Sequence, residues 1–280
     1  MKTRIDSYVS DIIGKVKEEY PFPEIIDETE HAIDFLASAL QELASDRGRL
    51  LDIGCGALDK TIVFQRMGYA CFGCDDFRDP WHARKENLDP VLKFAKEAGV
   101  QVYAQDDHYT IPWEPESFDV VTLVNVVEHV HESPREILNF AGRYLRTGGL
   151  LLVAMPNSVN LRKRLSVLRG QSNYTPVRGF YENEGEWRGH VREFTAEETR
   201  QVVEWTGFET VQTKTGHTMA RRRLGNPLML GIFKGICVVF PSFRDSLLVA
   251  ARKPEGWAPR EPDPEEMEKS LTASWVGHGS

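Results

Sequence analysis

The chain has 280 residues, enough for one large domain with a substantial core and a cap. Its 42 acidic and 34 basic residues give a net charge of −8, which disfavours broad, unspecific binding to nucleic acid. The first six residues lack the apolar core of a signal peptide, and the four cysteines lie in or beside apolar runs. We therefore expect a cytoplasmic protein with buried, inert thiols. Cys71 and Cys74 fall inside one predicted strand with no second pair after them, which disfavours a metal or redox site.

Two helices are predicted before the first strand. Apolar residues recur at helical spacing over residues 5–16 and again over residues 25–43, and Pro21 and Pro23 separate the two runs. This helical cover, residues 1–44, either packs its apolar faces into the core, which we favour, or lies over a ligand pocket.

The segment Leu50-Leu-Asp-Ile-Gly-Cys-Gly56 predicts a buried parallel strand that ends in a ligand-binding turn. Gly54 and Gly56 let the backbone approach a ligand closely, and Asp52 either anchors an ammonium group or orders the turn. A tight strand-to-helix turn without a ligand is the alternative. A dinucleotide site is disfavoured, because Asp59 stands where a third glycine is needed and Asp52 would repel a pyrophosphate.

Four further strands alternate with helices. The strands are predicted at residues 69–74, 100–104, 118–125 and 149–154, and the helices at residues 58–67, 90–98 and 134–145. This alternation implies a parallel sheet whose ligands bind at the carboxyl ends of the strands. Asp75 and Asp76 follow the glycine turn by about 20 residues, the spacing at which a carboxylate meets a ribose diol.

The motifs along this sheet, taken in order, resemble those of class I S-adenosylmethionine (SAM)-dependent methyltransferases. Six short motifs carry the resemblance: Leu51-Asp-Ile-Gly-Cys-Gly56, Gly73-Cys-Asp75, Asp107 before Pro112-Trp113, Ser117-Phe-Asp-Val-Val121, Glu128-His-Val130 and Gly148-Gly149. The likeness covers residues 45–157 well and residues 190–207 more loosely. Each motif alone is weakly specific, but six in the family's order are strong.

The resemblance implies both a fold and a cofactor site. The fold is α/β, a Rossmann-like doubly wound sheet of seven strands with the last antiparallel and helices on both faces; residues 208–214 and 246–252 would supply the final two strands. The cofactor would be SAM. Its methionine part would contact Asp52, Gly54, Cys55 and Gly56, and its ribose would contact Asp75 or Asp76. Asp106 or Asp107 would bind its adenine, and Asn125 and Val126 would lie beside its sulfonium. A cationic sulfonium suits acidic strand ends better than a basic phosphate cradle would. Only one aspartate of each adjacent pair would bind the cofactor, and the other is expected to cap a helix or a turn.

The acceptor side centres on Glu128, His129 and His190. We expect His129 or His190 to act as general base in methyl transfer. Some related O-methyltransferases of the ubiquinone pathway and of small RNA carry Glu-x-x-Glu-His after the fourth strand and bind a divalent cation there. Here Asn125 replaces the first Glu, which removes one charged ligand. A mechanism in which Glu128, His129 and His190 hold Mg²⁺ or Mn²⁺ is therefore less favoured than one with a histidine base alone. In a third interpretation Glu128 and His129 only shape the pocket.

Two insertions interrupt the main domain, residues 45–254. Residues 158–192 carry seven basic and three acidic residues with interleaved aromatic rings, which predicts a cap over an anionic, aromatic or sugar-like acceptor; a solvated basic helix is the alternative. Residues 216–245 contain the apolar run 228–240, which is too short to span a bilayer. We expect it to be buried or self-associating, and contact with a membrane surface would suit a lipid-linked acceptor. Residues 255–280 predict a disordered tail.

The sequence thus predicts a SAM-dependent O-methyltransferase acting on a hydroxylated small molecule or saccharide. An RNA 2′-O- or other nucleic-acid methyltransferase is one alternative. The negative net charge makes a nucleic-acid substrate less favoured than a small molecule. A SAM-binding regulator without catalysis is another.

Overall fold

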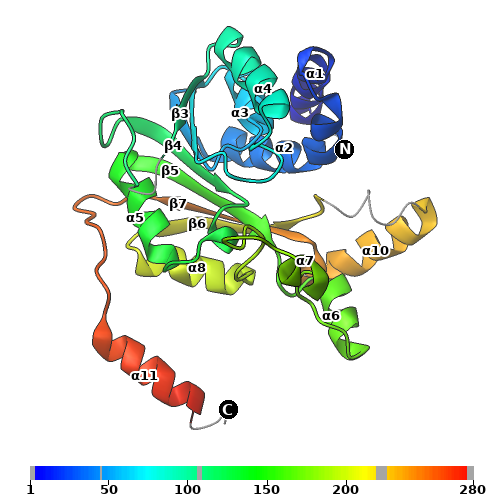
Figure 1. Cartoon of the computed structure of the whole chain (residues 1–280), viewed down its shortest axis with the longest axis vertical. Helices are drawn as coiled ribbons and strands as arrows, with labels where there is room; N and C mark the ends of the chain where they lie inside the picture. The colour runs from blue at the N-terminus through cyan, green and yellow to red at the C-terminus, as the bar shows by residue number, and fades with distance from the viewer. Residues whose placement is uncertain (1–3, 45, 106–108, 219–225, 276–280) are drawn as a thin grey trace.

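Seven strands form a single mixed sheet at the centre of the molecule (Figure 1). The computed structural model describes residues 4–44, 46–105, 109–218 and 226–275. The strand order is β3-β2-β1-β4-β5-β7-β6, and β7 runs antiparallel to the other six strands. The strands are β1 (Arg49–Ile53), β2 (Ala70–Asp75), β3 (Gln101–Ala104), β4 (Phe118–Val124), β5 (Leu145–Pro156), β6 (Glu209–Gly216) and β7 (Ser246–Arg252). The predicted Rossmann-like fold, with its antiparallel last strand, is confirmed.

Helices cover both faces of the sheet, because alternate residues of each central strand point to opposite sides. The helices are α1 (Arg4–Glu19), α2 (Pro23–Leu43), α3 (Asp59–Arg66), α4 (Lys85–Glu97), α5 (Pro134–Tyr144) and α8 (Ala196–Trp205). Leu50 of β1 and Leu152 of β5 face the core formed with α1 to α4, whereas Leu51 and Val153 face the core formed with α5 and α8.

The two N-terminal helices pack into the core, as we favoured. Val16 of α1 and Ile33 and Leu40 of α2 are buried in the same cluster as α3 and α4. The chain breaks between them at the expected prolines. Just beyond α1, the Tyr20 hydroxyl donates a hydrogen bond to the Ala57 carbonyl in the turn after β1. The helical cover therefore supports the glycine turn from behind.

The sheet changes direction between β1 and β4. From β1 the chain builds outward through β2 to β3, then returns to place β4 on the other side of β1. In doubly wound sheets the loops on either side of such a point separate and leave a crevice at the carboxyl ends of the strands. The glycine turn after β1 and the loop after β4 flank this crevice.

The two insertions form short helices beyond this edge. The insertion after β5 contains α6 (Leu161–Leu168) and α7 (Val177–Tyr181), and the insertion before β7 contains α10 (Pro227–Val239) and the short 3₁₀ helix η2 (Pro241–Phe243). Within the described residues no helix combines the length and apolarity needed to cross a bilayer.

The C-terminal segment differs from the expected disordered tail. The Trp257 indole N–H donates to the Thr206 carbonyl at 2.9 Å, and its ring lies against Gly142, where a Cβ would come within 2.3 Å. The backbone of Arg260 exchanges two hydrogen bonds with the Asn139 side chain, both 2.9 Å. Residues 257–260 thus brace α5 and α8, and α11 (Pro264–Trp275) follows as an exposed helix that projects from the body (Figure 1).

The bracing role of Trp257 can be measured as stability. We expect Trp257→Ala to lower the free energy of unfolding by about 2–3 kcal/mol, because it removes a large packed ring and a hydrogen bond. Urea unfolding followed by circular dichroism gives this number. The matched control is Trp205→Ala, whose side chain is 70% exposed and which should cost no more than about 0.5 kcal/mol. Equal losses in the two variants would show that the segment carries no packing energy.

Candidate active site

The glycine turn after β1 approaches the loop after β4 closely. Gly54 and Gly56 have φ values of +69° and +51°, a region that glycine occupies without strain. A Cβ on Gly54 would lie 2.4 Å from a methyl group of Val126. The Gly56 N–H donates to Asp75 Oδ2 at 2.8 Å, so the acid at the end of β2 holds the turn in place.

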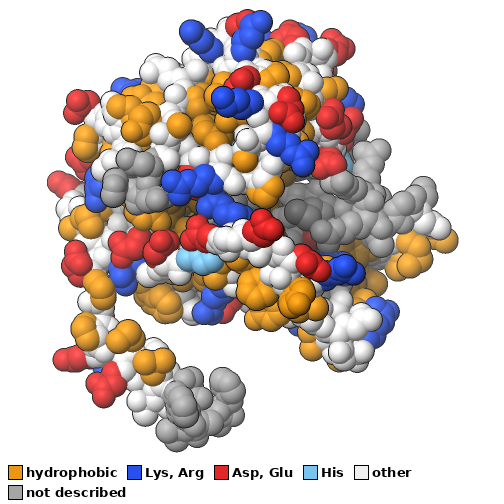
Figure 2. Space-filling model, viewed as in Figure 1, with side chains coloured by type: hydrophobic (Ala, Val, Ile, Leu, Met, Phe, Trp, Pro, Cys, Tyr) orange, Lys and Arg blue, Asp and Glu red, His pale blue; other side chains and the backbone are white. Residues whose placement is uncertain are grey.

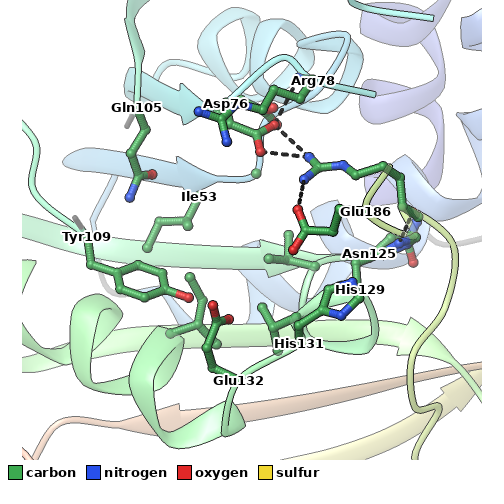
Figure 3. A pocket seen from close by; sticks show the side chains of 16 residues that line it. Ile53, Asp76, Arg78, Gln105, Tyr109, Asn125, His129, His131, Glu132 and Glu186 are labelled. Carbon is green, nitrogen blue, oxygen red and sulfur yellow. Dashed lines mark hydrogen bonds and ion pairs between the residues drawn. The ribbon is translucent and has the colours of Figure 1, made fainter. Parts of the chain in front are cut away.

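The structure distinguishes the two acids of the Asp75-Asp76 pair. Asp75 accepts from the backbone of Gly56 and, through Oδ1, from the Phe77 N–H at 2.7 Å. Asp76, on the pocket wall in Figure 3, accepts from Arg188 Nη2 through both oxygens at 2.8 and 2.7 Å. Arg188 comes from the cap insertion, so an element far away in sequence reaches the cofactor side of the sheet.

Three of the expected ligand contacts differ in the structure. Asp52 is fully buried and accepts from the hydroxyls of Thr61 at 2.6 Å and Thr122 at 2.7 Å, so it orders the strand ends and does not line the pocket. Burial raises the pKa of its carboxyl group. Cys55 is likewise fully buried, and neither Cys55 nor Gly56 lines the pocket. Asp106 and Asp107 lie outside the described residues.

A pocket of about 460 Å³ opens at the carboxyl ends of β1 to β4 (Figure 3). Asn125, directly after β4, has a φ of +57°, which asparagine tolerates better than most residues, and its N–H donates to the Ala154 carbonyl at 2.8 Å. The lining residues are Ile53, Gly54, Asp75, Asp76, Arg78, Gln105, Tyr109, Asn125, Val126, His129, Val130, His131, Glu132, Ile137, Glu186 and Arg188.

A second pocket of about 420 Å³ lies under the cap insertion. Its lining combines amides, a phenol ring, hydroxyls and cations, which are groups that bind hydroxylated or anionic molecules. The lining residues are Pro156, Asn160, Arg162, Lys163, Asn173, Tyr174, Thr175, Pro176, His190, Glu193 and Asp245.

Glu128, His129 and His190 meet between the two pockets. One potential ligand atom from each residue lies within 4.8 Å of the others, and the two imidazole rings meet edge to face with centroids 4.8 Å apart. His129 lines the first pocket and His190 the second. The Glu128 side chain is fully buried, and neither carboxylate oxygen has a hydrogen-bond partner among the described residues. Burial raises the pKa of Glu128 to about 8.

Both imidazoles are oriented through Nδ1. His129 Nδ1 lies 2.8 Å from the Arg188 carbonyl oxygen, and His190 Nδ1 lies 2.7 Å from Glu193 Oε1. Glu193 also forms an ion pair with the buried Lys163. Burial lowers the pKa of both histidines, and with His129 and Lys163 nearby that of His190 falls to about 4. The rings are therefore neutral near pH 7, with Nδ1 as donor and Nε2 left as acceptor or ligand.

Sequence reasoning missed three residues that hold this site together: Arg188, Glu193 and Lys163. Arg188 and Lys163 appeared only as members of a basic segment. The one local signal was the spacing of His190 and Glu193, three residues apart in a loop, which brings a carboxylate within reach of an imidazole. The pairing of Arg188 with Asp76 has no local signal, because the two residues are 112 positions apart.

The family model described as "Methyltransferase domain" matches residues 28–213. The chain belongs to this methyltransferase family. Its cofactor is SAM, as the resemblance implied.

Curated relatives match over part of their length. The chain is 33% identical over 111 residues to a ubiquinone biosynthesis O-methyltransferase of Caulobacter sp. strain K31, covering 39% of this chain and 41% of that protein. It is 27% identical over 167 residues to the Roseobacter denitrificans protein of the same name, covering 59% and 62%. The matches thus span less than two thirds of these relatives.

Solved structures share the fold at low identity. A SAM-dependent methyltransferase from Archaeoglobus fulgidus superposes with a TM-score of 0.52 at 18% identity, over 79% of this chain and 93% of that chain. This likeness confirms the architecture of the methyltransferase domain. It says nothing about the acceptor.

The buried Glu128 carboxyl group predicts a pH dependence of stability. Its pKa is about 8 in the folded protein and near 4.5 when exposed, so between pH 5 and 8 the folded state binds the extra proton. The contribution of Glu128 to stability should then fall as pH rises, by up to about 1.4 kcal/mol per pH unit, while the lowered pKa values of His129 and His190 act in the opposite direction below about pH 6.5. We expect the stability of Glu128→Gln to fall less steeply than that of the wild type between about pH 6.5 and 8, and the variant to be more stable than the wild type at pH 8. Urea unfolding at several pH values, in the presence of EDTA, tests this; identical slopes for both proteins would contradict it.

Proposed function

We propose that this methyltransferase methylates the hydroxyl oxygen of a small molecule bound in the second pocket. The observation that carries the proposal is the pair His129 and His190, because each ring lines one of two adjacent pockets and the rings touch. A cofactor in the first pocket and an acceptor in the second would meet at this pair.

The first pocket suits SAM. Gly54 leaves room for the methionine part, the acids at the end of β2 can accept from ribose hydroxyls, and Asn125 and Val126 line the wall where the sulfonium would lie. Carboxylates and carbonyl oxygens stabilise a positively charged sulfur. Adenine recognition by Asp106 or Asp107 stays a prediction. Gln105, which precedes them in the sequence, lines the first pocket.

Oxygen is the acceptor atom that we favour. The Caulobacter and Roseobacter relatives are named as O-methyltransferases. An alcohol or phenol becomes a better nucleophile when a neighbouring base takes its proton, and a neutral imidazole held by a carboxylate can do so. In the proposed step the acceptor oxygen attacks the methyl carbon in line, the bond from carbon to sulfur breaks, and S-adenosylhomocysteine leaves. The hydroxyl proton passes to His190 or His129.

The cluster also fits a divalent cation such as Mg²⁺ or Mn²⁺. A buried carboxylate without a partner beside two neutral imidazoles is a donor set that a cation would satisfy. Glu128, His129 and His190 would hold it, and a cation there would lower the pKa of a bound acceptor hydroxyl. Glu193 and the Arg188 carbonyl, by fixing Nδ1 of each ring, leave both Nε2 atoms available for this role.

The second pocket supports a hydroxylated acceptor. Asn173 offers an amide, Tyr174 a ring and Arg162 a cation, a combination able to bind hydroxyls beside a flat or anionic group. A saccharide stays our prediction for the acceptor class. A labelled-methyl assay against sugars, phenols and RNA distinguishes it from the alternatives.

Replacing the histidines tests the proposed mechanism. We expect His190→Ala and His129→Ala each to lower kcat by about 10² to 10⁴-fold, because proton removal from the acceptor is lost. The control His31→Ala lies on α2 outside both pockets and should stay within about twofold.

The same assay separates the two forms of the mechanism. Loss of activity in EDTA with recovery in Mg²⁺ or Mn²⁺ supports the mechanism with a bound cation. Full activity in EDTA supports the mechanism in which a histidine alone acts as the base. Near-normal turnover in both histidine variants would contradict the proposal.

The cofactor site is tested through Gly54. We expect Gly54→Ala to weaken SAM binding at least about tenfold, because a Cβ would collide with Val126 and strain a positive φ. Isothermal titration calorimetry measures the affinity, and a thermal melt shows that the variant is folded. Gly14→Ala, in α1 with no atom near its Cβ, is the matched control. Unchanged affinity in folded Gly54→Ala would place the cofactor elsewhere.

A further inference from the structure

Two surface segments carry large exposed apolar side chains on the same side of the molecule. The first is residues 161–181, with α6 and α7, and the second is residues 226–240, with α10; together they are called the basic apolar face. Both α6 and α10 pack against η2, where the Arg164 guanidinium lies over the Phe243 ring at 5.3 Å. Figure 1 shows α6, α7 and α10 grouped on one side of the molecule, at the lower right of the view.

The apolar side chains of this face lack neighbours to cover them. In Figure 2 hydrophobic side chains gather over α7 and at the outer end of α10. Exposed contiguous apolar surface on a protein marks a site of interaction. Seven side chains are at least 69% exposed: Leu168, Tyr174, Val177, Tyr181, Leu228, Val238 and Val239.

The charge of this face is opposite to that of the whole chain. Residues 158–181 contain five basic and no acidic residues, and residues 226–240 contain Lys234 and no acid, although the protein carries a net charge of −8. Arg162, Arg164, Arg169 and Lys234 are exposed. Acidic residues resume only at Glu182, which pairs with Arg178 at 3.6 Å. Exposed apolar groups interspersed with cations are typical of surfaces that bind anionic lipid headgroups.

A second copy of the chain fits this face less well. In a two-fold dimer the same patch meets itself, so the cations of one protomer would lie against those of the other. Neither segment contains an acid to compensate them, and like charges across an interface oppose association.

We propose that the basic apolar face docks this methyltransferase on an anionic lipid bilayer. The apolar side chains of α7 and α10 would enter the headgroup region while the arginines and Lys234 contact lipid phosphates. No spanning segment is needed for this kind of attachment, which is peripheral and reversible.

Docking would place the second pocket at the bilayer. Arg162, Tyr174, Thr175 and Pro176 line that pocket and belong to the face. The hydroxyl of an amphiphilic acceptor could then reach His190 while its apolar part stays in lipid. The delivery of an acceptor from the bilayer rests on the proposed function, but the docking itself does not. Vesicle binding measures the docking alone, because it needs neither cofactor nor acceptor.

Vesicle co-sedimentation of the full chain tests the docking. We expect binding to phosphatidylcholine vesicles containing about 30% phosphatidylglycerol, weak binding to phosphatidylcholine alone, and release as NaCl rises from about 0.05 to 0.5 M. The double variant Leu168→Glu with Val239→Glu should lower the partition coefficient at least about tenfold, since both side chains are solvent-exposed and would carry charge into the interface.

A matched variant controls for net charge. Trp205→Glu with Leu271→Glu adds the same two charges at exposed apolar positions on α8 and α11, and should bind vesicles like the wild type. Equal vesicle binding by the two double variants would overturn the proposal. So would a wild-type protein that ignores anionic vesicles and instead forms a dimer, seen by analytical ultracentrifugation, that only Leu168→Glu with Val239→Glu abolishes.

Discussion

The burial of Glu128 between the sheet and the cap is the constraint on which the site depends. Its backbone carbonyl accepts from the N–H groups of Val191 at 2.7 Å and Arg192 at 3.3 Å, so the loop after β4 anchors the end of the cap insertion. Its carboxyl group is removed from water without a hydrogen-bond partner in the described structure, which is costly for an ionised group. A bound proton or a bound cation relieves this cost. The same residue therefore fixes the cap and sets the chemistry between the pockets.

Most of the fold was predictable because its signals are local. Short apolar runs bounded by glycine and acids identify the buried strands, and β7 was predicted at its observed bounds, Ser246–Arg252. Prolines 21 and 23 mark the break between α1 and α2. The antiparallel direction of β7 came from the resemblance to a family, and the order of the strands was not predicted, since strand order depends on contacts that a single sequence does not display.

The parts that sequence did not reveal depend on contacts between distant residues. Trp257 follows charged, proline-containing sequence typical of disorder, yet its ring finds space only because position 142 is a glycine. Asp52 lies in a ligand-binding motif, but Thr61 and Thr122 surround its carboxylate, and Thr122 is on another strand. The side chains of α10 were expected to be buried or self-associating, yet many of them are exposed in the chain, because an apolar run has the same composition in either case.

Arg188 joins the two halves of the site through different atoms of one residue. Its guanidinium binds Asp76 on the cofactor side, and its carbonyl oxygen lies within hydrogen-bonding distance of His129 Nδ1. The carbonyl and the guanidinium belong to the same residue, so a displacement of the cap that breaks one contact also strains the other. A cap that opens for the acceptor would thus release the His129 ring from the orientation that exposes its Nε2. Because both contacts are made by Arg188, the position of the cap and the orientation of the His129 imidazole are physically coupled.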